Sequence, residues 1–222
     1  MKKEEVKMKF ILDRLLECHR VLVWSVSTLA GAEDNGPEDK IYYPTPSLLL
    51  IFCFLDFLKR FDYIWNYGKD GNENKDNCIN YKKFLNDFII GNEKYNEGRY
   101  TFNAGELYGI RCDLVHSFCL KKFYNESYIH FVDGTYFNEK SINILRDGLS
   151  KEKRININKV KVIKLYDFLS IVKNGILEMI ENYKTQIEKD NKLPLSLDEL
   201  YEDLEKSIFY YLHLSPGFQK KQ

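Results

Sequence analysis

The sequence predicts a mainly all-α protein: a helical bundle with a small antiparallel β insertion. Apolar residues recur at helical spacing near both ends of the chain, over residues 5–30 and from Lys164 onward. Between these regions, residues 127–163 are rich in β-branched side chains that partly alternate, as is typical of short strands. We therefore expect one domain over residues 1–222, with the β insertion at about 127–163 and C-terminal helices over 164–214 packing on the bundle.

Four helices are expected before the insertion. Their ranges are 5–30, from Pro46 to about Trp65, 78–90, and a segment that begins near Asn103. Polar stretches rich in Gly, Asn and Asp predict loops at 31–40 and 67–77. Asn103 is a suitable N-cap because its side chain can accept a hydrogen bond from the first helical turn.

Short strands are expected within the insertion. The segments "SYIHFVD", "SINILRD" and "RININKVKVI" suggest them, with Asp133-Gly134 and Asp147-Gly148 as turns. After Lys164 the helical period returns, and a final helix is predicted over residues 197–214, introduced by Pro194 and Ser196.

Composition limits the functional classes. The 33 basic and 33 acidic residues cancel, so the chain lacks the overall basic excess of a protein that coats nucleic acid. Its five cysteines are odd in number and unpaired in spacing, which favours a reduced, cytoplasmic protein. The N-terminus does not resemble a signal peptide, and the apolar run at 48–55 is too short to cross a bilayer, which needs about 20 residues. We expect no membrane partner.

Residues 107–118, "LYGIRCDLVHSF", carry the candidate site. On an ideal helix, four apolar residues form one narrow stripe that predicts the core face: Leu107, Ile110, Leu114 and Phe118. Arg111 lies at the edge of this stripe, and His116 lies roughly opposite it. Because a charged arginine beside a core face is seldom buried alone, Arg111 is expected to have an anionic or hydrogen-bonding partner.

The spacing of Arg111 and His116 bears on how they could act together. Five residues correspond to about 140° of helical rotation, so the two side chains are not expected to meet on one regular helix. They would converge if the helix ended between them, or if one came from a second copy of the chain. Arg14 and His19 have the same spacing, so spacing alone does not identify a site.

The segment "ELYGIRCDLVHSF" resembles the signature of the HEPN superfamily (higher eukaryotes and prokaryotes nucleotide-binding domains). Members are all-α domains with an Arg, four to six residues and then a His near the end of a late helix. The order of helices over about residues 5–120 is also similar. The segment at 127–163 resembles an insertion into the family core.

The resemblance implies a metal-independent endoribonuclease of the toxin or phage-defence type, which cleaves single-stranded RNA. Its active site would form across a homodimer, with Arg111 and His116 as catalytic residues and Tyr108, Cys112 and Asp113 in support. An antitoxin or a nucleotidyltransferase is a further partner that it implies. Cys112 stands where many active members have Asn, His or Asp, and silent members bind a nucleotide or protein partner instead.

The chemistry is consistent with these residue types. RNA supplies its own nucleophile, the 2′-OH. Histidine can move a proton near neutral pH, and arginine can hold a phosphate through two parallel hydrogen bonds. No cofactor or metal is required. Two alternatives remain open: Arg111 and His116 as purely structural residues, and Cys112, His116 and Cys119 as three zinc ligands that lack a fourth.

Overall fold

The computed structural model describes residues 3–29, 44–68, 77–90, 102–117, 120, 123–124, 126–132, 138–190 and 196–206. Its α-helices are α1 Lys3–Leu29, α2 Pro44–Tyr67, α3 Asn77–Leu85, α5 Ala104–Ser117, α6 Glu139–Lys153, α7 Leu165–Asp190 and α8 Leu197–Lys206. A π-helical turn, η1 Asn86–Ile90, continues α3, and a 3₁₀ turn, η2 Ile157–Lys159, precedes the last strand. The strands are β1 Phe123–Tyr124, β2 Ser127–Val132 and β3 Val160–Lys164. The predicted fold class, mainly α-helical with a small β insertion, is confirmed.

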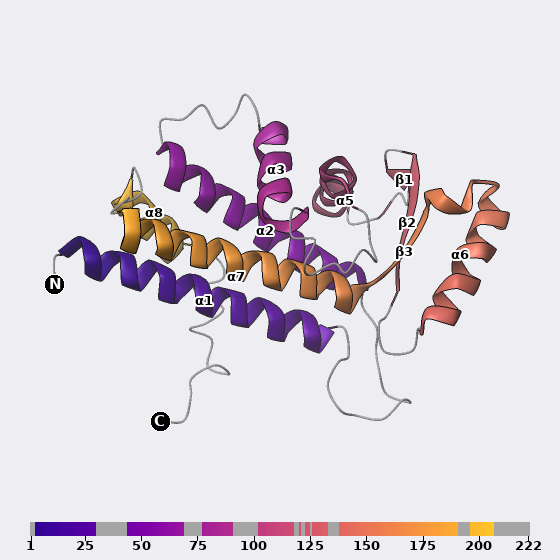
Figure 1. Cartoon of the computed structure of the whole chain (residues 1–222), viewed down its shortest axis with the longest axis horizontal. Coiled ribbons are helices and arrows are strands. Elements are labelled where there is room, and N and C mark those ends of the chain that lie inside the picture. Colours follow the sequence, from indigo (N-terminus) through magenta and orange to yellow (C-terminus); the bar gives the residue numbers. More distant parts are fainter. Residues whose placement is uncertain are drawn as a thin grey trace.

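The long helices α1, α2 and α7 form the body of the bundle (Figure 1). Their facing sides carry fully buried apolar side chains, including Leu15, Phe52 and Phe168. Aromatic rings link α2 to α7, where the Trp65 and Tyr183 rings stack with centroids 4.2 Å apart. The apolar character of α2 is therefore explained by its contacts with α1, α3, α5, α7 and α8.

The packing of α7 against η1 depends on a glycine. A Cβ atom placed on Gly175 would lie 2.0 Å from the carbonyl oxygen of Phe88. Because that neighbour is backbone, it cannot turn aside as a flexible side chain could. Gly175 thus permits a close approach of α7 to η1 that no other residue type would allow.

The small sheet is only partly antiparallel. Strand β1 pairs antiparallel with β2, but β2 pairs parallel with β3, with Tyr128 opposite Val160 and Val132 opposite Lys164. The prediction of an antiparallel insertion was therefore wrong for the β2–β3 pair. A parallel pair needs a long crossover, and α6 provides it, lying beside the sheet at the right of Figure 1.

The crossover helix α6 was predicted as a strand at "SINILRD", and this prediction was wrong. Ile142 and Ile144 alternate as in a strand, but Ile142, Leu145 and Leu149 share one helical face and pack with Tyr128 and Val162 in a second small core. Ile144 is 64% exposed. Asn138 caps the helix, and Gly148 lies inside it rather than in a turn.

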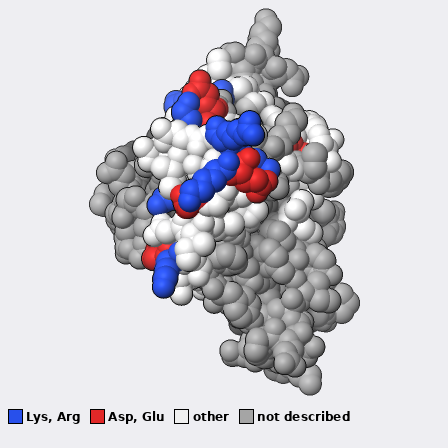
Figure 2. All heavy atoms as spheres, turned by 90° about the vertical axis from the view of Figure 1, so that its right-hand side faces the viewer, with Lys and Arg blue, Asp and Glu red and all other residues white. Residues whose placement is uncertain are grey.

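Charges of both signs are interleaved at the end of the molecule formed by the sheet and α6. Figure 2 shows basic and acidic side chains next to one another on this face. Ion pairs here include Lys151–Asp147, Lys153–Glu152 and Lys159–Glu126, with N–O distances of 2.5, 2.5 and 2.6 Å. Among the described residues of this face, the pairing leaves no wide patch of a single sign of the kind that attracts phosphate.

Several predictions concern residues outside the described ranges. They include the loop at 31–40, most of the loop at 67–77, and the part of the last helix after Lys206. Among the helices that the structure describes, none has a stretch apolar and long enough to span a bilayer.

Candidate active site

Helix α5 carries the candidate residues, and a capping box fixes where it begins. The Asn103 side chain accepts a hydrogen bond from the Glu106 backbone N–H at 2.8 Å, and the Glu106 carboxylate accepts one from the Asn103 N–H at 3.1 Å. The predicted N-cap at Asn103 is confirmed. Leu107, Ile110 and Leu114 are fully buried, which confirms the predicted core face as far as the described residues extend; Phe118 lies outside them.

Glu106 also anchors α5 to the sheet. Its side chain is 1% exposed, and both carboxylate oxygens accept hydrogen bonds from Lys161 Nζ of β3 at 2.7 Å. A buried carboxylate is tolerated only when it is paired and hydrogen-bonded, so Lys161 and the capping box together account for its burial. Contacts with both the bundle and the β insertion thus fix the direction of α5, the site helix.

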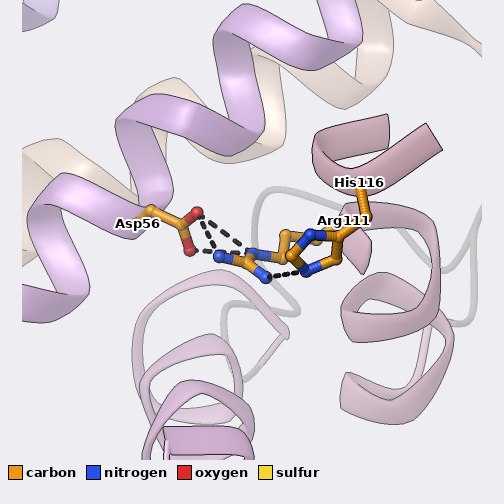
Figure 3. A network of polar contacts seen from close by, with 3 residues as sticks. All are labelled: Asp56, Arg111 and His116. Atoms are coloured by element: carbon orange, nitrogen blue, oxygen red, sulfur yellow. Dashed lines mark hydrogen bonds and ion pairs between the residues drawn. The ribbon is translucent and has the colours of Figure 1, made fainter. Parts of the chain in front are cut away.

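Arg111 is held by Asp56 of α2 (Figure 3). Arg111 Nε donates to Asp56 Oδ1 at 3.1 Å and to Oδ2 at 3.0 Å, and Nη2 donates to Oδ2 at 2.8 Å. Burial of the guanidinium acts to lower the Arg111 pKa, but the hydrogen bonds and charge of Asp56 outweigh it and raise the pKa. The expectation that Arg111 has a fixed anionic partner is confirmed.

His116 meets Arg111 on the same helix. His116 Nε2 lies 3.5 Å from Arg111 Nη1, although α5 continues through both residues to Ser117 (Figure 3). The expectation that they cannot meet on one regular helix was therefore wrong. The angular estimate follows the Cα–Cβ directions, whereas the long arginine side chain extends sideways and closes the gap. His116 is exposed, as predicted from its position opposite the core face.

A buried tyrosine lies against the Arg111 guanidinium. The Tyr81 ring of α3 has its centroid 5.9 Å from Arg111 Cζ, within the range of a cation–π contact. Tyr81 is 1% exposed, and its hydroxyl has no hydrogen-bond partner among the described residues. Burial, followed by the charge of Asp56, raises the pKa of Tyr81 well above its ordinary value, so the hydroxyl remains protonated at neutral pH.

The three supporting residues differ in their positions. Tyr108 is half-buried and packs against Tyr81, with ring centroids 5.8 Å apart. Burial and a hydrogen bond with Cys112 raise the Tyr108 pKa to about 12. Cys112 is half-buried and directly follows Arg111 on α5. Asp113 is only 5% exposed, in contrast to the exposed His116.

The pair with the same spacing, Arg14 and His19, has a different environment. Arg14 is paired with Glu17 at 2.5 Å and lies over the Phe10 ring. His19 is 4% exposed, and burial lowers its pKa to about 4. A neutral histidine inside the α1 packing face cannot reach an external substrate.

The metal alternative can be examined only in part, because Cys119 lies outside the described residues. Within the described ranges, no three His, Cys, Asp or Glu side chains are grouped so that they could hold a metal ion.

Asp56 does not engage all of the N–H donors of the Arg111 guanidinium, so some of them are available to a ligand. Of the five N–H donors of an arginine, Asp56 engages those of Nε and one of Nη2. Nη1, which Asp56 does not engage, faces His116 Nε2 at 3.5 Å. An anion that approaches this edge would meet a positive hydrogen-bond donor and an exposed imidazole together.

Sequence reasoning missed two members of this arrangement, Asp56 and Tyr81. Asp56 interrupts the otherwise apolar run of α2, and an isolated carboxylate in a core helix is a signal for a buried partner. Nothing in the α3 sequence distinguishes Tyr81 from an ordinary core tyrosine.

Comparison of the chain with models of protein families, with curated proteins and with solved structures finds no match.

Proposed function

We propose that the protein is a metal-independent endoribonuclease of the toxin or phage-defence type, and that Arg111 and His116 are its catalytic residues. The observation that carries the proposal is the 3.5 Å approach of His116 Nε2 to an Arg111 whose other side is fixed by Asp56. An exposed proton-transfer group beside a phosphate-binding group is what cleavage of RNA by its own 2′-OH requires.

The reaction would proceed by in-line attack. The 2′-OH gives up its proton to a histidine, its oxygen attacks the adjacent phosphorus, and the 5′-oxygen leaves after it receives a proton. The products are a 2′,3′-cyclic phosphate and a 5′-OH end. Arg111 would hold the nonbridging phosphate oxygens and stabilise the developing charge, an effect worth about 10²–10³ in rate.

Two proton transfers need two groups at the scissile bond. One His116 could take the proton from the 2′-OH, and the same histidine of a second copy could supply the proton to the leaving oxygen. This division of roles favours an active site completed in a homodimer, with the two copies of α5 facing each other.

A labelled single-stranded RNA provides the test. Wild type should cleave it in EDTA, and His116→Ala should lower the rate by about 10²–10⁴ without a change in melting temperature, because His116 is exposed. Ser117→Ala, the neighbouring exposed residue of α5, is the matched control and should cleave like wild type. An oligonucleotide of the same sequence with 2′-deoxyribose throughout should resist cleavage, because it lacks the nucleophile.

The proposal fails if His116→Ala cleaves like wild type, if the deoxy oligonucleotide is cut, or if cleavage needs added magnesium. The last two results would indicate an attacking water rather than the 2′-OH.

A second candidate is a catalytically silent helical module that binds a nucleotide or protein partner. The Asp56 contacts favour it, because a doubly hydrogen-bonded carboxylate satisfies Arg111 without a ligand. Absence of cleavage by a folded wild-type protein, with toxicity on expression equal for wild type and His116→Ala, would favour this candidate.

A further inference from the structure

A cavity of about 420 Å³ lies between α2, α3–η1 and α7. Neither Arg111 nor His116 lines it, so it is separate from the candidate active site. Its volume falls within the roughly 300–1,000 Å³ of small-molecule sites in proteins. The helices that surround it are labelled α2, α3 and α7 in Figure 1.

The cavity contains a carboxylate with one oxygen in use. Asp62 Oδ1 accepts hydrogen bonds from the Tyr183 hydroxyl at 2.6 Å and from Asn66 Nδ2 at 3.0 Å. Both bonds are on Oδ1, and no described residue donates to Oδ2. Burial raises the pKa of Asp62, while the Tyr183 hydrogen bond opposes this rise. Oδ2 is therefore available to a ligand that donates a hydrogen bond.

The two amides beside Asp62 have orientations set by their partners. Asn66 Nδ2 donates to both the Asp62 backbone carbonyl and Oδ1, at 2.9 and 3.0 Å, so Asn66 Oδ1 remains as an acceptor. Gln186 Oε1 accepts from Trp65 Nε1 at 3.2 Å, and because indole can only donate, Gln186 Nε2 remains as a donor. Asp62 and Asn66 thus each offer an acceptor and Gln186 offers a donor, in a cavity whose lining also includes Lys59, Lys83 and Asp87.

Aromatic side chains supply the apolar part of the lining. Tyr63 and Tyr67 of α2 have ring centroids 5.2 Å apart, and Phe84 and Phe88 of α3–η1 have theirs 5.4 Å apart. Aromatic rings from two different helices suit a flat ligand, since stacking on them contributes to binding whatever substituents the ligand's ring carries.

We propose that this cavity binds a guanine-type heterocycle, a planar ring system with two adjacent N–H donors and a carbonyl acceptor on one edge. The N1–H and N2–H groups of guanine would donate to Asp62 and Asn66, and its O6 would accept from Gln186. Adenine places an acceptor where guanine has N1–H, and cytosine has only one donor on that edge. The site should therefore discriminate among the bases.

Calorimetric titration with guanosine, adenosine and cytidine tests the proposal. Guanosine should bind, and the other two should bind at least about tenfold more weakly, because each leaves at least one of these three polar groups without a hydrogen bond from the ligand. A short single-stranded RNA with one guanosine separates the two possible sources of the ring. Competition between this RNA and free guanosine would assign the cavity to a base of RNA, and independent binding would assign it to a small molecule.

Two isosteric variants locate the site. Asp62→Asn keeps an acceptor for Tyr183 but replaces the free oxygen with a donor, and Gln186→Glu keeps the acceptor for Trp65 but removes the donor. Each should weaken guanosine binding by about tenfold or more. Asp147→Asn on α6, whose side chain is 50% exposed, is the matched control and should bind like wild type.

Absence of guanosine binding at millimolar concentration would overturn the proposal. So would unchanged guanosine binding by a folded Asp62→Asn or, if that variant does not fold, by Gln186→Glu. His116→Ala should bind guanosine like wild type, so the outcome here does not depend on whether the protein cleaves RNA.

Discussion

Asp56 and Arg111, 55 residues apart in the chain, are joined by N–O contacts of 3.1, 3.0 and 2.8 Å between α2 and α5. Their side chains are 28% and 18% exposed. The pair is thus neither a solvated surface contact nor a fully buried one. It both fixes the guanidinium and ties the site helix to the centre of the bundle.

The Asp56–Arg111 pair should contribute measurably to stability. Arg111→Ala and Asp56→Ala should each lower the free energy of unfolding by about 1–3 kcal/mol, because each leaves a partly buried charge unpaired. A double-mutant cycle from urea unfolding should give a coupling of about 1 kcal/mol. The Lys151–Asp147 pair, with side chains 76% and 50% exposed, is the matched control and should couple by no more than about 0.5 kcal/mol. Equal couplings in the two cycles would mean that Asp56 does not anchor Arg111.

The second prediction concerns assembly. If two copies of α5 complete one active site, the protein should be a homodimer in solution, with α5 at the interface. Light scattering across micromolar concentrations measures the mass. Replacement of the exposed Ser117 by Arg should weaken the dimer through like-charge repulsion, whereas Lys140→Glu on α6 should not. A strict monomer at high micromolar concentration would contradict the composite site.

Two glycines should respond oppositely to the same substitution. Gly175→Ala should destabilise the protein by about 3 kcal/mol, because the new Cβ would lie 2.0 Å from a backbone oxygen of η1. Gly148→Ala should stabilise it by about 0.5–1 kcal/mol, because Gly148 lies inside α6 with no atom within 4 Å of a Cβ. Urea unfolding of both variants measures the two changes. Similar changes for both would mean that α7 and η1 do not pack as closely as described.

The fourth prediction concerns acid stability. The pKa of the buried His19 is lowered from 6.5 to about 4, first by burial and then by the charge of Lys173. The unfolded state therefore binds a proton between these pH values while the folded state does not, and the free energy of unfolding should fall as the pH drops through this window. The loss should reach about 3 kcal/mol near pH 4. His19→Leu removes the titrating group, so the stability of this variant relative to wild type should rise as the pH falls through the same window. Parallel curves for the two proteins would show that His19 titrates equally in both states.

The helical part of the fold could be predicted from sequence because each long helix carries an apolar face at a regular period. Helix α6 could not, since "SINILRD" fits both periods and the choice depends on a strand pair that brings Tyr128 and Val162 against it. A packing contact that depends on the tertiary structure cannot be predicted from a short segment of the sequence.

The candidate site was predictable to a similar degree. The burial of the α5 stripe, the exposure of His116 and the need of Arg111 for an anion follow from helical geometry and the cost of burying charge. The identity of that anion did not follow, because any of several carboxylates could have come near. The contact between Arg111 and His116 was missed because side-chain length and rotamer decide it, and neither is contained in an angular projection.

The Lys161–Glu106 ion pair has a consequence for any attempt to shorten this protein to its main helical bundle. A shortened chain that omits residues 127–163 would lose the lysine that pairs with Glu106, a carboxylate that is 1% exposed in the whole protein. A minimal bundle would thus need a second change at Glu106, such as Gln, before its size could be reduced without loss of the helix start.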